Sequence, residues 1–340
     1  MPVFPGNERC RIERSPAVGG LRGPSRKNSS WQVAKERCKM KIRRVMRFPG
    51  LNRTRQFLSV VFRLPMNEHG GMDETSGRLE IPLDDPRDVI MASRHADRIE
   101  ICRALDREGL TPSPELVASI RAAVEEVGRD GLDGGRMAPD LVVLHQQTPP
   151  RSTGVEPDHS IFVPRSDEIT TLVLELPRFA ESGATAVVIG FLGPDGTLDQ
   201  RSIERVVSAA GTVGMSVAFH RAFDLVPDPA DAVRSLRDLG VRRALASGVP
   251  GFDSSVIDFN RRRSRLQAAL EAGGDEFEIV FCGGVRADLL DRMGLAFPAV
   301  HASCRGDADA SGRRVFDPSV ARALRAAIDR RKLESRSDRG

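Results

Sequence analysis

Eight apolar runs of β-strand length recur along the chain, and they constrain its fold more than any other feature. Amphipathic stretches that end near Gly or Pro separate most of these runs and predict helices. Eight such repeats over about 250 residues fit a closed barrel with a parallel sheet better than an open doubly wound sheet, which commonly has five or six strands. The sequence therefore predicts an α/β fold, a (β/α)8 TIM barrel.

The expected strands are Arg78–Leu83, Arg98–Cys102, Leu141–Leu144, Ala186–Leu192, Ser216–Phe219, Arg243–Ala246, Glu278–Phe281 and Pro298–Ala302. The expected helices are Pro114–Val127, Ile169–Ser182, Ser202–Ala210, Ala230–Leu239, Val256–Ala272 and Arg286–Met293.

A change in charge marks the expected domain boundaries. Residues 1–67 hold 16 Lys and Arg against 3 Asp and Glu, a net charge of +13, whereas the rest of the chain holds 35 against 44, a net charge of −9. The Pro, Gly and Ser content of the basic part predicts a disordered extension over residues 1–75. A single barrel domain over 76–330 and a charged tail over 331–340 follow. Translation from Met66 or Met72 would leave that barrel complete.

Composition limits the cellular compartments and the kinds of partner that are expected for the chain. No apolar run approaches the roughly 20 residues that span a bilayer, and the start lacks the apolar core of a signal peptide. The 5 cysteines have no paired spacing, which argues against a disulfide framework. A basic extension could bind nucleic acid or an anionic membrane. Because nothing outside the extension supports either partner, we expect a cytoplasmic protein with no membrane span and no nucleic-acid partner.

Polar residues gather where the predicted strands end, and in a barrel all strand ends open on one face. The segment from Phe219 to Asp224 ends a buried run with a histidine, an arginine and an aspartate. Carboxylates inside apolar runs need a partner, because an unpaired buried charge costs several kcal/mol. The candidate catalytic residues are Glu80, Glu100, His220, Arg221 and Asp224. A polar cluster of Glu80, Glu100, His220 and Arg221 at the barrel mouth is expected, with a structural ion pair as the alternative.

Small and polar residues near the later strand ends are candidate ligand-binding groups. They are Gln147, Ser247, Gly248, Gly283, Gly284, His301 and Ser303. Glycines there let a phosphate approach backbone N–H groups, or they simply form tight strand-to-helix turns. Both interpretations stand at this point.

Several segments resemble one family. These are ADRIEIC at 96–102, VVIGFLGPDGTLD at 187–199, AFHRAFD at 218–224, GGVRADLL at 283–290 and VHASCR at 300–305. In order and content they resemble the CutC family over about residues 78–328. The resemblance implies a cytoplasmic, oligomeric barrel that is linked to copper homeostasis and binds a metal or a small molecule.

The metal expectation depends on Cys102, since Cu(I) prefers thiolate and thioether donors. Cys102 shares strand parity with Glu100, so both are expected to face the barrel interior. The family commonly has a cysteine two residues after the glutamate of the first strand, where this chain has Pro82. Without that partner, a buried apolar role for Cys102 stays open.

Two functions of different class follow. The resemblance implies a copper-binding homeostasis protein that forms a homo-oligomer. The residues alone favour a lyase, isomerase or hydrolase for a small phosphorylated or acidic metabolite. In that enzyme Glu80 or Glu100 would act as the general base and His220 as the acid.

Overall fold

A computed structural model describes residues 77–130, 136–149, 159–250, 257–308, 310 and 314–337. The predicted basic extension, residues 1–75, lies outside these residues. All the described helices and strands belong to one unit, Glu68–Gly340.

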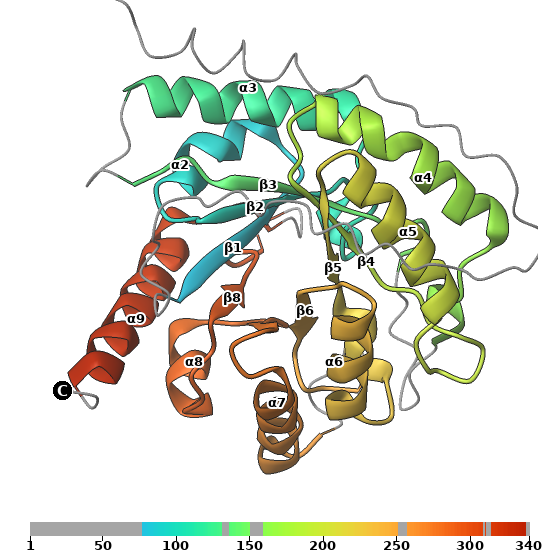
Figure 1. Ribbon diagram of the computed structural model, residues 1–340. Helices are drawn as coiled ribbons and strands as arrows, with labels where there is room; N and C mark the ends of the chain where they lie inside the picture. The colour runs from blue at the N-terminus through green and yellow to red at the C-terminus, as the bar shows by residue number, and fades with distance from the viewer. Residues whose placement is uncertain are drawn as a thin grey trace, which may run out of the picture. The chain divides into compact units, whose positions relative to one another are not determined.

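This unit is a closed barrel of parallel strands in the order β1-β2-β3-β4-β5-β6-β7-β8 (Figure 1). The strands are β1 (Arg78–Leu83), β2 (Arg98–Ile101), β3 (Asp140–Leu144), β4 (Ala186–Ile189), β5 (Ser216–Phe219), β6 (Arg243–Ala246), β7 (Glu278–Phe281) and β8 (Ala299–His301). The ring closes where Glu80 of β1 pairs with His301 of β8. The TIM-barrel prediction is confirmed.

Helices connect the strands and surround the barrel (Figure 1). The α-helices are α2 (Val89–Ser93), α3 (Pro114–Asp130), α4 (Ser166–Glu181), α5 (Gln200–Thr212), α6 (Pro229–Asp238), α7 (Phe259–Gly273), α8 (Ala287–Met293) and α9 (Pro318–Ser337). The 3-10 helices are η1 (Pro86–Asp88), η2 (Leu105–Arg107), η4 (His159–Phe162) and η5 (Arg221–Leu225). Within the described segments, no helix is both long enough and apolar enough to cross a membrane.

Aspartates define where three of these helices begin. Asp199, Asp228 and Asp258 each accept a backbone N–H from the first turn of the helix that follows, at 2.8 to 3.1 Å. Such N-caps satisfy donors that have no partner inside the helix. In α6 the cap is followed by Pro229, whose fixed φ suits the first helical position. These caps define where α5, α6 and α7 begin.

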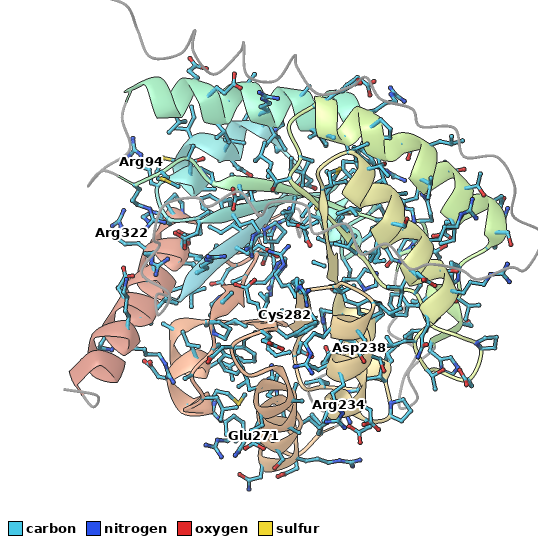
Figure 2. All side chains as sticks on the ribbon, viewed as in Figure 1. Arg94, Arg234, Asp238, Glu271, Cys282 and Arg322 are labelled. Carbon is cyan, nitrogen blue, oxygen red and sulfur yellow. The ribbon has the colours of Figure 1, made fainter. Side chains whose placement is uncertain are left out.

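Alternation along the strands separates two cores. Apolar residues on the outer face of the barrel pack under the helices in one large cluster. Residues of the opposite parity form a smaller cluster inside the barrel, with Cys102, Val188, Leu245 and Cys282 among its members. The labelled Cys282 lies toward the centre in Figure 2, whereas Arg94, Glu271 and Arg322 lie on the exposed side of the helices. The interior parity therefore decides which side chains reach the barrel mouth.

The predicted boundaries differ from the structure in a few places. β4 ends at Ile189 and not at Leu192, because Leu192 instead forms an antiparallel bridge with Leu198. The short helix α2 and the C-terminal helix α9 were not among the expected helices. α9 extends to Ser337, past the boundary expected at 330. The start expected for α7, Val256, lies outside the described residues.

Candidate functional site

A cavity of about 810 Å³ opens where the strands end, and most of the loops contribute to its wall. Its lining includes Glu100 from β2, Gln146 after β3, Arg221 after β5, Gly284 after β7 and His301 from β8. Pockets of a few hundred to a thousand Å³ suit small-molecule ligands. The position agrees with the face on which barrels place their sites.

Below the cavity, Glu80 is the centre of a buried ionic network. Its Oε2 accepts from Arg98 Nη1 at 3.2 Å and from Arg243 Nη1 at 3.1 Å, and its Oε1 contacts His301 Nδ1 at 2.8 Å. Glu278 approaches both arginines, at 3.6 and 3.9 Å. Burial favours the neutral acid, but Arg243, His301 and Arg98 outweigh it and hold the pKa of Glu80 well below its usual range. Glu80 is therefore ionised and fully paired.

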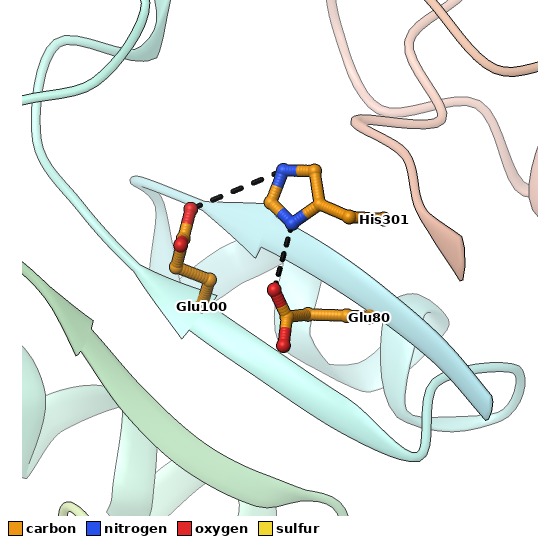
Figure 3. Close-up of side chains that lie close together, drawn as sticks. All are labelled: Glu80, Glu100 and His301. Atoms are coloured by element: carbon orange, nitrogen blue, oxygen red, sulfur yellow. Dashed lines mark hydrogen bonds and ion pairs between the residues drawn. The ribbon is translucent and has the colours of Figure 1, made fainter. Parts of the chain in front are cut away.

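His301 connects this network to the cavity (Figure 3). Because an ionised carboxylate only accepts, the Nδ1 of His301 carries a proton and donates a hydrogen bond to Glu80 Oε1. Its Nε2 lies 3.9 Å from Glu100 Oε2. Burial opposes the charged imidazolium, but the carboxylates of Glu100 and Glu80 overcome it and raise the pKa of His301.

Glu100 is the least satisfied group in this cluster. The carboxyl is 6% exposed, and its Oε1 is buried with no hydrogen-bond partner in the described part of the chain. Burial raises the pKa of Glu100 to about 7; Glu80 also raises it, and His301 opposes the rise. A carboxyl that titrates near neutral pH in a cavity wall can both accept and donate a proton.

His220 lies at the end of β5 and lines the same cavity. Its Nδ1 accepts from Ala222 N at 3.0 Å, so its remaining proton is on Nε2. The ring occupies space that any side chain at position 190 would fill, since a Cβ on Gly190 would lie 1.8 Å from the His220 Cε1. Burial, followed by the charges of His145 and Arg221, lowers the pKa of His220 to about 3. The imidazole is therefore neutral and presents an N–H donor.

Arg221 also lines the cavity and is held between two carboxylates. It lies 3.8 Å from Glu108 and 3.8 Å from Asp224. Asp224 is buried and accepts from Ser247 N, Ser247 Oγ and Gly248 N at 2.7 to 3.0 Å. Asp224 therefore holds Arg221 in position, and Ser247 and Gly248 hold Asp224. None of these three residues is part of the cavity wall.

The cysteines inside the barrel differ from the metal-binding expectation. Cys102 is fully buried outside the cavity wall, and its thiol contacts the Leu83 carbonyl at 3.7 Å. Burial, with Glu100 and Asp84 nearby, raises the pKa of Cys102 well above its ordinary value, and burial does the same for Cys282. In the described segments, the one cluster of three or more potential metal ligands is Glu80, Glu100 and His301, whose ligand atoms lie within 4.8 Å of one another.

The structure also shows which sequence candidates meet. Seven of the candidates line the cavity: Glu100, His220, Arg221, Gly283, Gly284, His301 and Ser303. Glu80 was expected beside Arg221, but its cations are Arg98 and Arg243, because these share its interior parity. Gln147 is exposed, and its neighbour Gln146 lines the cavity with the parity of Leu144.

Arg98 and Arg243 were missed by the sequence reasoning because each is the first residue of its strand. Counting by twos from Glu100 and from Leu245 places both of them inside the barrel. Asp84, which pairs with Arg305 at 3.0 Å on the cavity wall, had no such signal.

The sequence profile of the CutC family matches residues 133–305. A CutC family protein of Rhizobium meliloti is 29% identical over 260 residues, covering 76% of this chain and 93% of that protein. A CutC family protein of Klebsiella pneumoniae strain 342 is 32% identical over 192 residues, 56% of this chain and 65% of that protein.

A solved structure described as the copper homeostasis protein CutC of Streptococcus agalactiae matches with a TM-score of 0.54. It has 22% sequence identity, and the match covers 66% of this chain and 98% of that one. That likeness supports the barrel fold. The family profile, which spans half of the chain, leads by itself to one conclusion: this chain belongs to the CutC family.

Proposed function

We propose that the chain is an enzyme that moves a proton on a small anionic metabolite, with Glu100 as the general acid and base. The reaction class is proton abstraction from a carbon beside a carbonyl, which serves isomerases and lyases. The carrying observation is the Glu100 carboxyl, which is buried in the cavity wall with a pKa of about 7 and whose Oε1 has no partner among the described residues. A catalytic pKa near the working pH gives the most efficient proton transfer.

In this proposal His220 stabilises the negative charge that develops. As the proton moves from carbon to Glu100, the bonding electrons flow to the carbonyl oxygen, where the His220 Nε2–H donates a hydrogen bond. The sequence suggested His220 as an acid, but with a pKa of about 3 the imidazole has no extra proton to give at neutral pH. A neutral imidazole donor fits an oxyanion better because it polarises the carbonyl without losing its proton.

Glu80 and His301 have supporting roles in this proposal. Ionised Glu80 fixes the His301 Nδ1–H and turns Nε2 toward Glu100 at 3.9 Å. His301 can then exchange a proton with Glu100 or stabilise its ionised form. Returning the proton to a neighbouring carbon completes an isomerisation, and loss of a β substituent completes a lyase reaction.

The test follows solvent deuterium into candidate substrates. Phosphorylated sugars and short keto acids are incubated with the protein in D2O, and incorporation is measured by mass spectrometry. Glu100→Gln should slow incorporation by about 100-fold or more. Asp106→Asn is the matched control, because it makes the same chemical change at an exposed carboxylate of the cavity rim and should stay within about 3-fold. Equal rates for wild type and Glu100→Gln would reject the proposal.

Copper binding is the second candidate, and the Glu80, Glu100 and His301 cluster is the observation that favours it. These residues do not fit Cu(I), because the Cys102 thiol stays protonated and belongs to no ligand cluster in the described part of the chain. Carboxylate and imidazole donors suit a divalent ion, which Glu100 and the His301 Nε2 would hold while Glu80 orients the imidazole.

The copper test is a titration with Cu(I) and with Cu(II) against competing chelators. Glu100→Gln should abolish Cu(II) binding, while Cys102→Ser should leave it unchanged. If only Cys102→Ser lost binding, the Cys102 thiol would be the metal ligand. The small-molecule ligand, the homo-oligomer and the cytoplasmic location implied by the resemblance stay predictions.

A further inference from the structure

The loop between β7 and α8 contains three consecutive backbone N–H groups that have no acceptor among the described residues. These are the N–H groups of Gly283, Gly284 and Val285, and none of them donates to any residue in the described part of the chain. All three residues line the cavity. Buried backbone donors rarely lack an acceptor, and Val285 is fully buried, whereas Gly283 is half-buried and Gly284 is exposed. A run of N–H groups that begins at the open cavity and ends at a buried donor with no acceptor among the described residues indicates a place for a ligand with several acceptor atoms.

The backbone conformation of this loop depends on glycine. Gly283 and Gly284 have φ values of +82° and +68°, in the left-handed region that glycine adopts without strain. A Cβ at Gly283 would lie 2.7 Å from the Cβ of Ser247, whereas a Cβ at Gly284 would meet nothing within 4 Å. Successive N–H groups in such turns form concave nests that bind anions. Open space therefore lies beside Gly284, whereas Ser247 fills the space beside Gly283.

Positive charge and one hydroxyl surround the same loop. The Nη2 of Arg221 lies 3.7 Å from the Cβ position of Gly283. Arg286 is held against the loop by the carbonyls of Val285 and Arg305, at 3.0 and 2.7 Å. Ser303, at the end of the neighbouring strand β8, also lines the cavity.

We propose that the N–H groups of Gly283, Gly284 and Val285, with the Ser303 hydroxyl, bind the phosphoryl group of a small phosphate monoester. Three N–H donors and a hydroxyl match the three terminal oxygens of a phosphate better than the two oxygens of a carboxylate. Arg221 and Arg286 supply the charge that a dianion requires. This inference rests on the proposed enzymatic function, because it fixes the anionic end of the substrate beside β7 and β8 and leaves Glu100 and His220 for the reacting carbons.

The experiment measures anion binding to the full chain by backbone amide NMR. Inorganic phosphate, glycerol 3-phosphate and acetate are titrated at constant ionic strength. Both phosphates should shift the amide signals of Gly283, Gly284 and Val285, and acetate should bind at least about 10-fold more weakly. Phosphate shifts centred elsewhere, or none at millimolar phosphate, would overturn the subsite. Binding of inorganic phosphate without the ester would overturn its role for a substrate.

Two variants separate a local subsite from the general field of the cavity. Ser303→Asp places a negative charge beside the bound phosphate and should weaken its binding by about 100-fold. Gln147→Glu adds the same charge at an exposed position after β3 and should weaken binding by less than about 3-fold. Equal losses in the two variants would reject the subsite. If Ser303→Asp does not fold, Ser303→Ala should weaken binding about 5-fold with an unchanged amide spectrum elsewhere.

The Glu100→Gln variant separates this inference from the proposed function. It should keep phosphate binding and lose deuterium exchange. Retained exchange with normal phosphate shifts would reject the proton transfer and leave the subsite. Lost exchange without phosphate shifts would reject the subsite and leave the proton transfer.

Discussion

The barrel interior has two halves, one charged and one apolar, and their buried side chains are stabilised in different ways. The charged half comprises Glu80, Arg98, Glu100, Arg243 and His301. The apolar half, on β3, β4 and β5, comprises Val142, Leu144, Ala186, Val188 and Ala218. The apolar half needs only volume to be filled. The charged half needs a partner for every ionised group, because each lone charge would cost several kcal/mol.

The difference shows where a functional group can be recognised. In the charged half the partners of Glu80 are complete, and its carboxylate behaves as a structural ion. Glu100 lies next to this network, and its Oε1 stays unpartnered within the described segments. A protein that only needed stability would gain from an apolar residue there. The incomplete member of an otherwise satisfied cluster is therefore the stronger catalytic candidate.

The largest expected effect comes from removing the central carboxylate of the charged half. Glu80→Ala leaves Arg98 and Arg243 buried without their shared carboxylate, and should reduce the free energy of unfolding by about 3 to 5 kcal/mol. The matched change in the apolar half, Val188→Ala, removes two methyl groups and should cost about 2 kcal/mol. Chemical denaturation of both variants measures the difference. A smaller loss for Glu80→Ala than for Val188→Ala would mean that the network is hydrated and contributes little.

The next effect is a pH dependence in the charged half alone. Because the folded-state pKa of Glu100 is raised from 4.5 to about 7, its contribution to stability is complete below pH 4.5 and is lost as the pH rises through 7. Between these values the wild type should lose about 3 kcal/mol relative to Glu100→Gln, whose side chain does not titrate. The raised pKa of His301 acts in the same direction, and the lowered pKa of Glu80 matters only in more acidic solution.

Unfolding free energies of wild type and Glu100→Gln at several pH values measure this effect. Val142→Ala serves as the control, since its offset from wild type should not change with pH. A constant difference between wild type and Glu100→Gln would mean that Glu100 titrates normally and is solvated.

The apolar half could be predicted from the sequence more fully than the charged half. Strand periodicity located all eight strands, because apolar parity is a local signal that each run carries by itself. The strand-end candidates Glu100, His220 and His301 also follow from it. The pairing of Glu80 with Arg243 joins residues that are far apart in the chain, and only the closed register brings them within 3.1 Å. No local pattern carries that information.

The pKa values could not be read from the sequence for the same reason. His220 and Glu100 are both titratable residues near strand ends, yet burial lowers the pKa of one and raises that of the other. In the proposed reaction His220 is therefore a neutral donor and not the acid that the sequence suggested, because its Nδ1 accepts from the Ala222 N–H, a contact within the 3-10 turn that follows β5.

The smallest expected effect concerns Gln146 and Gln147, which end the apolar half after β3. The Gln146 side chain is buried and donates to the Thr148 carbonyl at 2.6 Å, so Gln146→Ala should cost about 1 kcal/mol, the value of one neutral hydrogen bond. Gln147 is exposed, and Gln147→Ala should change stability by less than about 0.5 kcal/mol. Thermal unfolding of the two variants compares adjacent residues of opposite parity. If Gln147→Ala were the more destabilising, the alternation of β3 would not continue past Leu144, and the position of Gln146 in the cavity wall would be wrong.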